Sequence, residues 1–210
     1  MLVDSHSHLF LEEFAEDLPF VMERARAAGV THIFMPNIDS TTIEPMLSVC
    51  DTYRDFCFPM FGLHPTSVNE SYEKELEIVA ANLETSGRFV AVGEIGIDLY
   101  WDKTWLKEQL IAFEKQVQWA LHYQLPIVIH CREAFDYIYK VLQPYKNSGL
   151  TGIFHSFTGT PGEAVRMMEF PGFKIGINGV VTFKKSTLPE TLKSVPLERI
   201  VLETDSPYLT

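Results

Sequence analysis

Seven histidine and carboxylate residues, of types that bind transition metals, each end or follow a short apolar run. They are His6, His8, His64, Glu94, His130, His155 and Asp205. From His8 onward, the gaps between them are one or two lengths of a strand–helix repeat. Imidazole is the commonest metal ligand when several converge, and a bound metal can activate water. The set therefore predicts a metal-dependent hydrolase.

The His6-Ser7-His8 motif lies in an extended segment, where a period of two places both imidazoles on one face. As metal ligands they would form a pincer, and the alternative is a pair of exposed histidines near the terminus. Glu94 lies in the apolar run Val92–Asp98, where burying a carboxylate is costly unless a cation or a salt bridge compensates it. Asp98 has the same parity and could support the site from behind or cap the following loop.

The next two histidines end strands that look buried, His130 after Pro126–Ile129 and His155 after Gly152–Phe154. A lone histidine there is more often a hydrogen-bonded core residue. The convergence of several such residues favours metal ligation instead.

Two carboxylates share one face of the segment Ile200–Pro207 by the same period of two. Asp205 could ligate a metal or take the proton of the attacking water, and its alternative is a turn role before Pro207. Glu203 could be a further ligand or hold a ligand in place.

Arg132 and His64 are the candidates for contact with the substrate. The guanidinium of Arg132 could bind a phosphate, although a surface ion pair is an equal alternative. His64 could hold a phosphate or a leaving group, or only order its loop. His32 begins a strand and His122 ends a helix, so we expect both to be structural.

The elements that must position these residues alternate between strands and helices. Expected strands are 2–6, 32–35, 57–63, 90–95, 127–130, 152–155, 174–177 and 200–203, and helical periodicity lies between them. Thr160 with Glu163, and Thr41 with Glu44, have capping-box spacing at helix starts. An α/β (β/α)8 barrel of the TIM type fits eight strands better than a doubly wound open sheet, and strand ends then meet at one face. Such barrels typically need about 250 residues, and only a few residues follow the eighth strand, so we expect the last helix to be missing or supplied otherwise.

Composition narrows the function classes. The 210 residues predict one domain, 1–210, and the net charge of −11 argues against a broad basic surface for duplex nucleic acid. No apolar stretch is long enough for a membrane helix, and no secretory signal is evident. Cys50, Cys57 and Cys131 are expected to be reduced thiols of a cytoplasmic protein. No obligate protein partner is evident.

Six motifs together resemble the TatD family of metal-dependent deoxyribonucleases, within the amidohydrolase superfamily. They are Asp4-Ser5-His6-Ser7-His8, Gly62-Leu63-His64-Pro65, Gly93-Glu94-Ile95-Gly96-Ile97-Asp98, His130-Cys131-Arg132-Glu133-Ala134, His155-Ser156-Phe157-Thr158-Gly159 and Leu202-Glu203-Thr204-Asp205-Ser206-Pro207. The resemblance covers essentially the whole chain, and the order and spacing of the motifs make it specific. Family chains continue past the last motif with a basic loop and a helix, which these residues lack.

The resemblance implies a distorted barrel that holds two divalent ions. His6, His8 and Asp205 would bind one ion and His130 and His155 the other. Glu94 would bridge the two ions, in place of the carbamylated lysine used elsewhere in the superfamily. The implied substrate is DNA with single-stranded or frayed 3′ ends, with RNA as a further substrate of some members.

The residues leave the metal and two other functions open. Histidines with carboxylates favour Zn²⁺, Mn²⁺, Ni²⁺ or Fe²⁺, whereas Mg²⁺ prefers oxygen ligands. One alternative function is hydrolysis of a small amide, lactone or phosphotriester, although Glu94 rather than lysine counts against it. The other is a non-catalytic remnant that binds metal.

Overall fold

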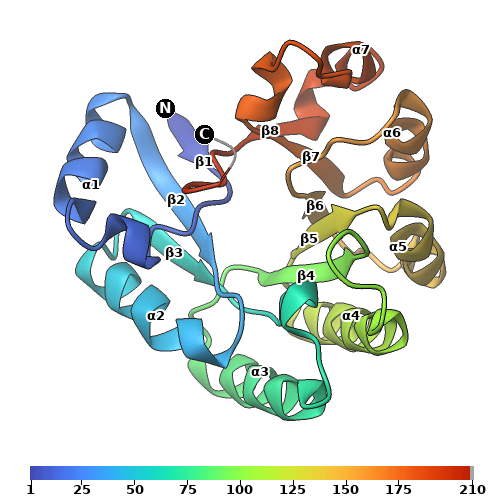
Figure 1. Ribbon diagram of the computed structural model, residues 1–210, viewed down its shortest axis with the longest axis horizontal. Helices are drawn as coiled ribbons and strands as arrows, with labels where there is room; N and C mark the ends of the chain where they lie inside the picture. The colour runs from blue at the N-terminus through green and yellow to red at the C-terminus, as the bar shows by residue number, and fades with distance from the viewer. Residues whose placement is uncertain (209–210) are drawn as a thin grey trace.

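The computed structural model describes residues 1–208, and of Ser86 only the backbone. Eight strands alternate with helices along the chain (Figure 1). The strands are β1 (Leu2–Asp4), β2 (Val30–Pro36), β3 (Cys57–Met60), β4 (Val92–Asp98), β5 (Ile127–Arg132), β6 (Gly152–Phe154), β7 (Phe173–Ile177) and β8 (Ile200–Leu202). The α-helices are α1 (Leu18–Ala27), α2 (Ile43–Thr52), α3 (Tyr72–Ser86), α4 (Leu106–Tyr123), α5 (Phe135–Leu142), α6 (Pro161–Met168) and α7 (Leu188–Leu192). Within residues 1–208, no helix follows β8.

The strands form two parallel sheets, β1-β2-β3 and β4-β5-β6-β7-β8, that follow one another around a ring with the helices outside (Figure 1). Backbone hydrogen bonds cross both gaps between the sheets. Phe61 and Gly93 join the β3 and β4 segments at 3.0 Å, and the Ser5 amide donates to the Leu202 carbonyl, also at 3.0 Å. The expected α/β fold of parallel strands alternating with helices is confirmed, and its ring-like arrangement favours the barrel over a doubly wound open sheet.

A side-chain clasp reinforces the seam between β1 and β8. The Asp4 carboxylate accepts hydrogen bonds from the Thr204 amide at 2.9 Å and from the Thr204 hydroxyl at 2.7 Å. Thr204 lies between Glu203 and Asp205, and Asp4 lies two residues before His6. The clasp therefore fixes two of the motifs against each other.

Helix starts follow the sequence in one case and depart from it in another. Thr160 and Glu163 form the expected capping box at the start of α6. The box expected for Thr41 and Glu44 is wrong, because the Asp39 carboxylate accepts the Thr41 amide and begins a 3-10 turn. Helix α2 then continues from that turn.

Strand β4 is buried along all seven of its residues. The strand runs between the barrel interior and α4, so its side chains meet protein on both faces. Glu94 and Asp98 are therefore held in the interior, each only 2% exposed. No helix within residues 1–208 is long and apolar enough to cross a membrane.

Candidate active site

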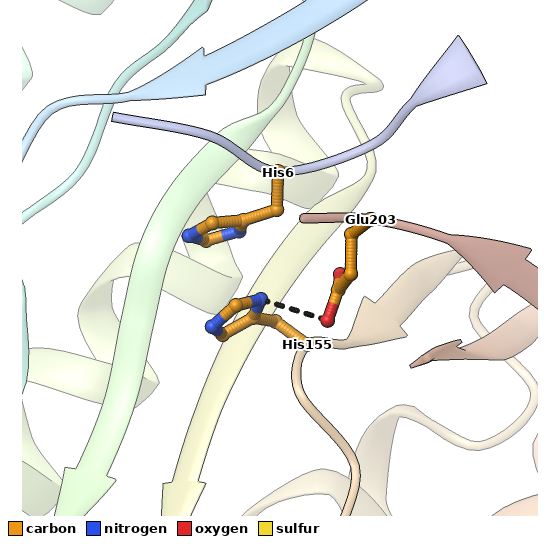
Figure 2. Close-up of side chains that lie close together, drawn as sticks. All are labelled: His6, His155 and Glu203. Atoms are coloured by element: carbon orange, nitrogen blue, oxygen red, sulfur yellow. Dashed lines mark ion pairs between the residues drawn. The ribbon is translucent and has the colours of Figure 1, made fainter. Parts of the chain in front are cut away.

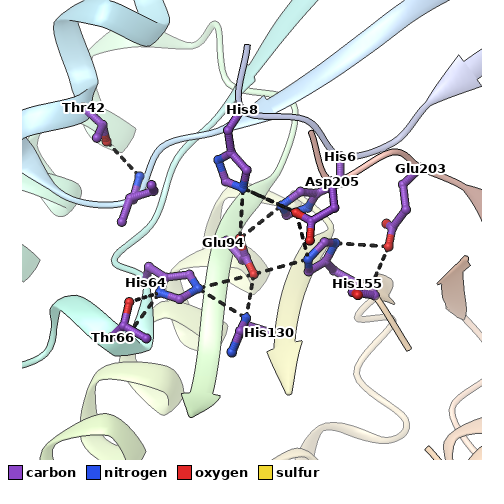
Figure 3. Close-up of polar contacts among 12 residues, drawn as sticks. His6, His8, Thr42, His64, Thr66, Glu94, His130, His155, Glu203 and Asp205 are labelled. Carbon is purple, nitrogen blue, oxygen red and sulfur yellow. Dashed lines mark hydrogen bonds and ion pairs between the residues drawn. The ribbon is translucent and has the colours of Figure 1, made fainter. Parts of the chain in front are cut away.

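The residues singled out in the sequence converge at one end of the ring of strands (Figure 3). His6, His8, His64, His155, Glu203 and Asp205 follow their strands in loops. Glu94 and His130 differ slightly from expectation, because β4 and β5 extend past them to Asp98 and Arg132. Strands β4 and β5 end later than their apolar runs suggested, because the pairing between them continues through these polar residues.

Glu94 is the centre of the cluster, and its two carboxylate oxygens face different histidines (Figure 3). Oε2 lies 3.1 Å from His6 Nε2 and 3.7 Å from His8 Nε2. Oε1 faces three others, at 3.0 Å from His130 Nδ1, 3.5 Å from His64 Nε2 and 3.7 Å from His155 Nε2. The carboxylate thus separates the histidines into two groups while touching both.

Asp205 closes the cluster on the side opposite Glu94. Its Oδ1 lies 3.5 to 3.8 Å from the Nε2 atoms of His155, His8 and His6. The backbone of Asp205 has a φ of 60°, which is uncommon for a non-glycine residue, and its amide donates to the His6 carbonyl. Backbone pairing across the β1–β8 seam therefore sets where this carboxylate points.

His155 is held between a histidine and a carboxylate (Figure 2). The His6 ring stacks on it with centroids 3.5 Å apart, and Glu203 Oε1 lies 3.2 Å from its Nδ1. Glu203 Oε1 also accepts the Ser156 amide at 2.5 Å, while Oε2 has no hydrogen-bond partner within residues 1–208. Glu203 is behind His155 and leaves Nε2 of that ring facing Glu94 and Asp205.

Asp98 holds His130 in a similar way, with Oδ2 2.7 Å from His130 Nε2. Its Oδ1 accepts the Tyr100 amide at 2.9 Å, so one carboxylate positions both the histidine and the next loop. The parity of Asp98 with Glu94 indicated this supporting position. The loop-capping alternative is present as well, because the two roles use different oxygens.

Two buried glutamines of α4 complete the support, and sequence reasoning missed them. Gln109 exchanges two hydrogen bonds with the backbone of Asp98, at 2.9 and 3.2 Å. Gln116 does the same with Leu63, the residue before His64, at 2.7 and 3.3 Å. Both stand on the otherwise apolar face of α4, seven residues apart, which is the signal that could have found them. Asp4 was also missed as the partner of Thr204.

Charge and burial act in opposite directions on the pKa values of the cluster. Burial alone would raise the pKa of Glu94, but His6, His155, His64 and His130 hold it well below its usual range. Burial lowers the pKa of His155, yet Glu203, Glu94 and Asp205 raise it to about 10. For His8, burial and the neighbouring His6 leave the pKa well below its usual range. The cluster therefore combines an anionic centre with at least one imidazole that stays neutral.

The donor set fits divalent metal ions. Three groups bring ligand atoms within 4.8 Å of one another: His6, His8 and Asp205; His64, Glu94 and His130; and His6, His155 and Glu203. The Nε2 atoms of His6 and His8 lie 3.1 Å apart, and their buried Nδ1 atoms have no hydrogen-bond partner in the described part of the chain. Buried imidazole and carboxylate atoms directed at common points are costly unless a cation compensates them. The residues can therefore hold metal.

Comparisons with known proteins agree with this chemistry. Residues 3–210 match the family model described as TatD related DNase. The chain is 35% identical to the uncharacterized metal-dependent hydrolase YabD of Bacillus subtilis, over 100% of this chain and 82% of the relative. It is 30% identical to the 3′-5′ ssDNA/RNA exonuclease TatD of Pantoea ananatis, over 99% of this chain and 80% of that one. The crystal structure of the Escherichia coli TatD homolog YjjV superposes with a TM-score of 0.91 at 30% identity, covering 99% and 80% of the two chains.

The chain belongs to the TatD family. The protein is accordingly a metal-dependent hydrolase, an enzyme acting on ester bonds, as the sequence predicted. The alternative of a non-catalytic remnant has no support in these comparisons.

A cavity of about 720 Å³ opens over the cluster of this TatD-family hydrolase. Its floor includes His8, His64, Glu94, His130, His155 and Asp205, and its wall includes Trp101, Arg132, Phe183 and Tyr208. The Arg132 guanidinium lies 3.7 Å from the centroid of the Tyr100 ring, and within residues 1–208 it forms no ion pair. His32 stacks on Phe58 and His122 packs against Tyr123, both outside this cavity.

Proposed function

We propose that this TatD-family hydrolase is a deoxyribonuclease that uses two divalent ions to cleave phosphodiester bonds of single-stranded DNA from the 3′ end. The observation that carries the proposal is that the two oxygens of Glu94 face different histidines, Oε2 facing His6 and Oε1 facing His130. A carboxylate placed in this way suits a bridge between two ions. The printed name of the Pantoea relative supports the substrate class, and it includes RNA as a second substrate.

In this proposal His6, His8 and Asp205 hold one ion, and His130 and His155 hold the other. Glu94 serves both. His64 lies as close to Glu94 Oε1 as His155 does, and 3.3 Å from His130 Nδ1, so it faces the same side as the second group. Bound divalent ions would supply positive charge to the phosphate and a more acidic water as nucleophile.

The remaining roles belong to side chains around these ligands. Asp205 faces the cavity and is the carboxylate best placed to accept a proton from attacking water. Glu203 and Asp98 orient the rings of His155 and His130, Glu203 by its contact with His155 Nδ1 and Asp98 by its hydrogen bond with His130 Nε2. Arg132 and His64 line the cavity and would contact the substrate phosphate.

The test is release of mononucleotides from a single-stranded oligonucleotide by the purified chain, with Mg²⁺, Mn²⁺ or Zn²⁺ added separately. A 5′-labelled strand reports the direction, because attack from the 3′ end shortens the labelled strand one nucleotide at a time. A strand closed into a circle is the matched control and should stay intact. Hydrolysis of a small ester or lactone, with no release from any strand, would overturn the proposal in favour of an amidohydrolase-type activity.

A further inference from the structure

Large aromatic side chains stand exposed around the mouth of the cavity. Trp101 is 72% exposed, Phe183 51% and Tyr208 46%, and all three line the cavity. Trp101 lies in the loop after β4 and Phe183 in the loop after β7, three strands apart around the ring. Exposed aromatic surface beside a polar site indicates a ligand with flat apolar faces.

Positive charge accompanies the aromatics on both sides of the mouth. Among the described residues, Arg132 is the only lysine or arginine that lines the cavity, and its guanidinium lies 5.4 Å from the Trp101 ring centroid. Lys184 and Lys185 directly follow Phe183, are exposed, and form no ion pair within residues 1–208. In a chain with a net charge of −11, cations beside the two aromatic positions mark an anionic ligand.

Flat rings beside cations are the combination that binds single-stranded nucleic acid. Each base offers a face for stacking, and the backbone offers phosphates to lysine and arginine. Bases in a duplex are already stacked and paired, so they have no free face for the side chains. A shallow protein-binding surface would not need its aromatics to border the buried histidines.

We propose that Trp101 and Phe183 stack on unpaired bases of a single-stranded nucleic acid that enters the cavity. Arg132, Lys184 and Lys185 face its phosphates. This inference rests on the proposed nuclease function. It adds the residues that select an unpaired strand over a duplex or a small ester.

The experiment compares two probes of the same length in the metal-loaded enzyme. One is oligothymidylate, and the other is a chain of abasic sites with the same phosphates. Binding is measured by fluorescence anisotropy on phosphorothioate versions that resist cleavage, and kcat/KM on the phosphodiester versions. The variants are Trp101→Ala, Phe183→Ala and Trp101→Phe. Phe20→Ala is the matched control, because Phe20 is 61% exposed on α1 and does not line the cavity.

We expect Trp101→Ala and Phe183→Ala each to weaken binding of oligothymidylate by roughly 5- to 150-fold and to leave binding of the abasic chain unchanged. Trp101→Phe should keep most of the affinity, and Phe20→Ala all of it. Oligouridylate should show the same losses, since stacking does not read the sugar.

Equal losses on both probes, or none on either, would overturn the inference. So would a wild-type enzyme that binds neither strand. A wild-type enzyme that binds oligothymidylate through Trp101 but cleaves no strand would instead overturn the proposed function and leave the stacking role intact. Cleavage of oligothymidylate that is unchanged in both alanine variants would overturn the stacking role and leave the proposed nuclease function intact.

Discussion

The carboxylate of Glu203 occupies the space that a side chain at Gly176 would need. A Cβ atom on Gly176 would lie 2.2 Å from Glu203 Oε2. Glu203 on the β8 side can therefore reach His155 only because the facing residue of β7 is glycine. The two positions act as one unit that sets the orientation of His155.

Replacing Gly176 should disturb this unit. We expect Gly176→Ala to push Glu203 away from His155 and to lower the free energy of unfolding by about 1–3 kcal/mol. Metal affinity or activity should fall by roughly 10- to 100-fold, since His155 loses its supporting carboxylate. Urea denaturation and metal titration measure the two effects. Gly162→Ala is the control, because a Cβ atom there would have Thr160 Oγ1 as its nearest neighbour, at 3.9 Å. Similar losses in this variant would remove the steric explanation.

Removal of the central carboxylate should empty both metal positions. We expect Glu94→Ala to lose both ions and all measurable activity, because the five surrounding histidines lose their common anionic partner. Elemental analysis of the purified variant gives the metal stoichiometry. His122→Ala, outside the cavity, should keep both its metal and nearly unchanged turnover. Two ions retained without Glu94 would end the bridging assignment.

Asp98 should act on metal affinity through His130. Asp98→Asn keeps an oxygen for the Tyr100 amide but loses the charged contact with His130 Nε2. We expect metal affinity to fall by roughly 10- to 100-fold, with little change in the unfolding midpoint of the metal-free protein. Isothermal titration calorimetry with Zn²⁺ or Mn²⁺ measures the metal affinity. Asp102→Asn, fully exposed in the same loop, should bind metal like the wild type, and an equal effect there would point to the loop instead of His130.

The three cysteines should be unreactive in the folded protein. Burial raises the pKa values of Cys50, Cys57 and Cys131 to about 12. Because only the thiolate reacts, at pH 8 on the order of one thiol in ten thousand is ionised, far fewer than in the unfolded chain. A thiol reagent added at pH 8 should label the native protein slowly and label three thiols rapidly in urea. The native rate should rise as pH approaches 12. Rapid native labelling at pH 8 would contradict the raised pKa values of these thiols.

Most of the fold could be predicted, because the strands are short apolar runs and several of the helices have a clear period. Positions of polar residues within strands were harder. Glu94 and His130 were placed at strand ends because the apolar runs stop there, whereas the backbone pairing of β4 with β5 continues to Asp98 and Arg132. The choice between Thr41 and Asp39 as a cap depends on which side-chain oxygen lies within reach of a free backbone amide, and spacing alone does not decide it.

The supporting residues were least predictable. Repeat-length spacing brought the histidines and carboxylates to one end of the barrel, because parallel strands share a direction. The partners of Leu63 and Asp98 come from a helix packed outside the strands, so their spacing follows no such rule. Gln116 and Gln109 could be recognised only as polar interruptions of an apolar helix face, a signal that many unrelated glutamines would give.

The clasp of Asp4 with Thr204 joins residues 200 positions apart. His6 and His8 lie just after one side of it, and Asp205 just after the other, so this half of the site cannot form in any partly folded chain that leaves the seam open. Loop-closure entropy makes contacts of such sequence separation slow to form. Enzyme activity should consequently be the last property to return on refolding, lagging behind helical circular dichroism, and it is a more stringent measure of complete folding than any spectroscopic signal from the helices.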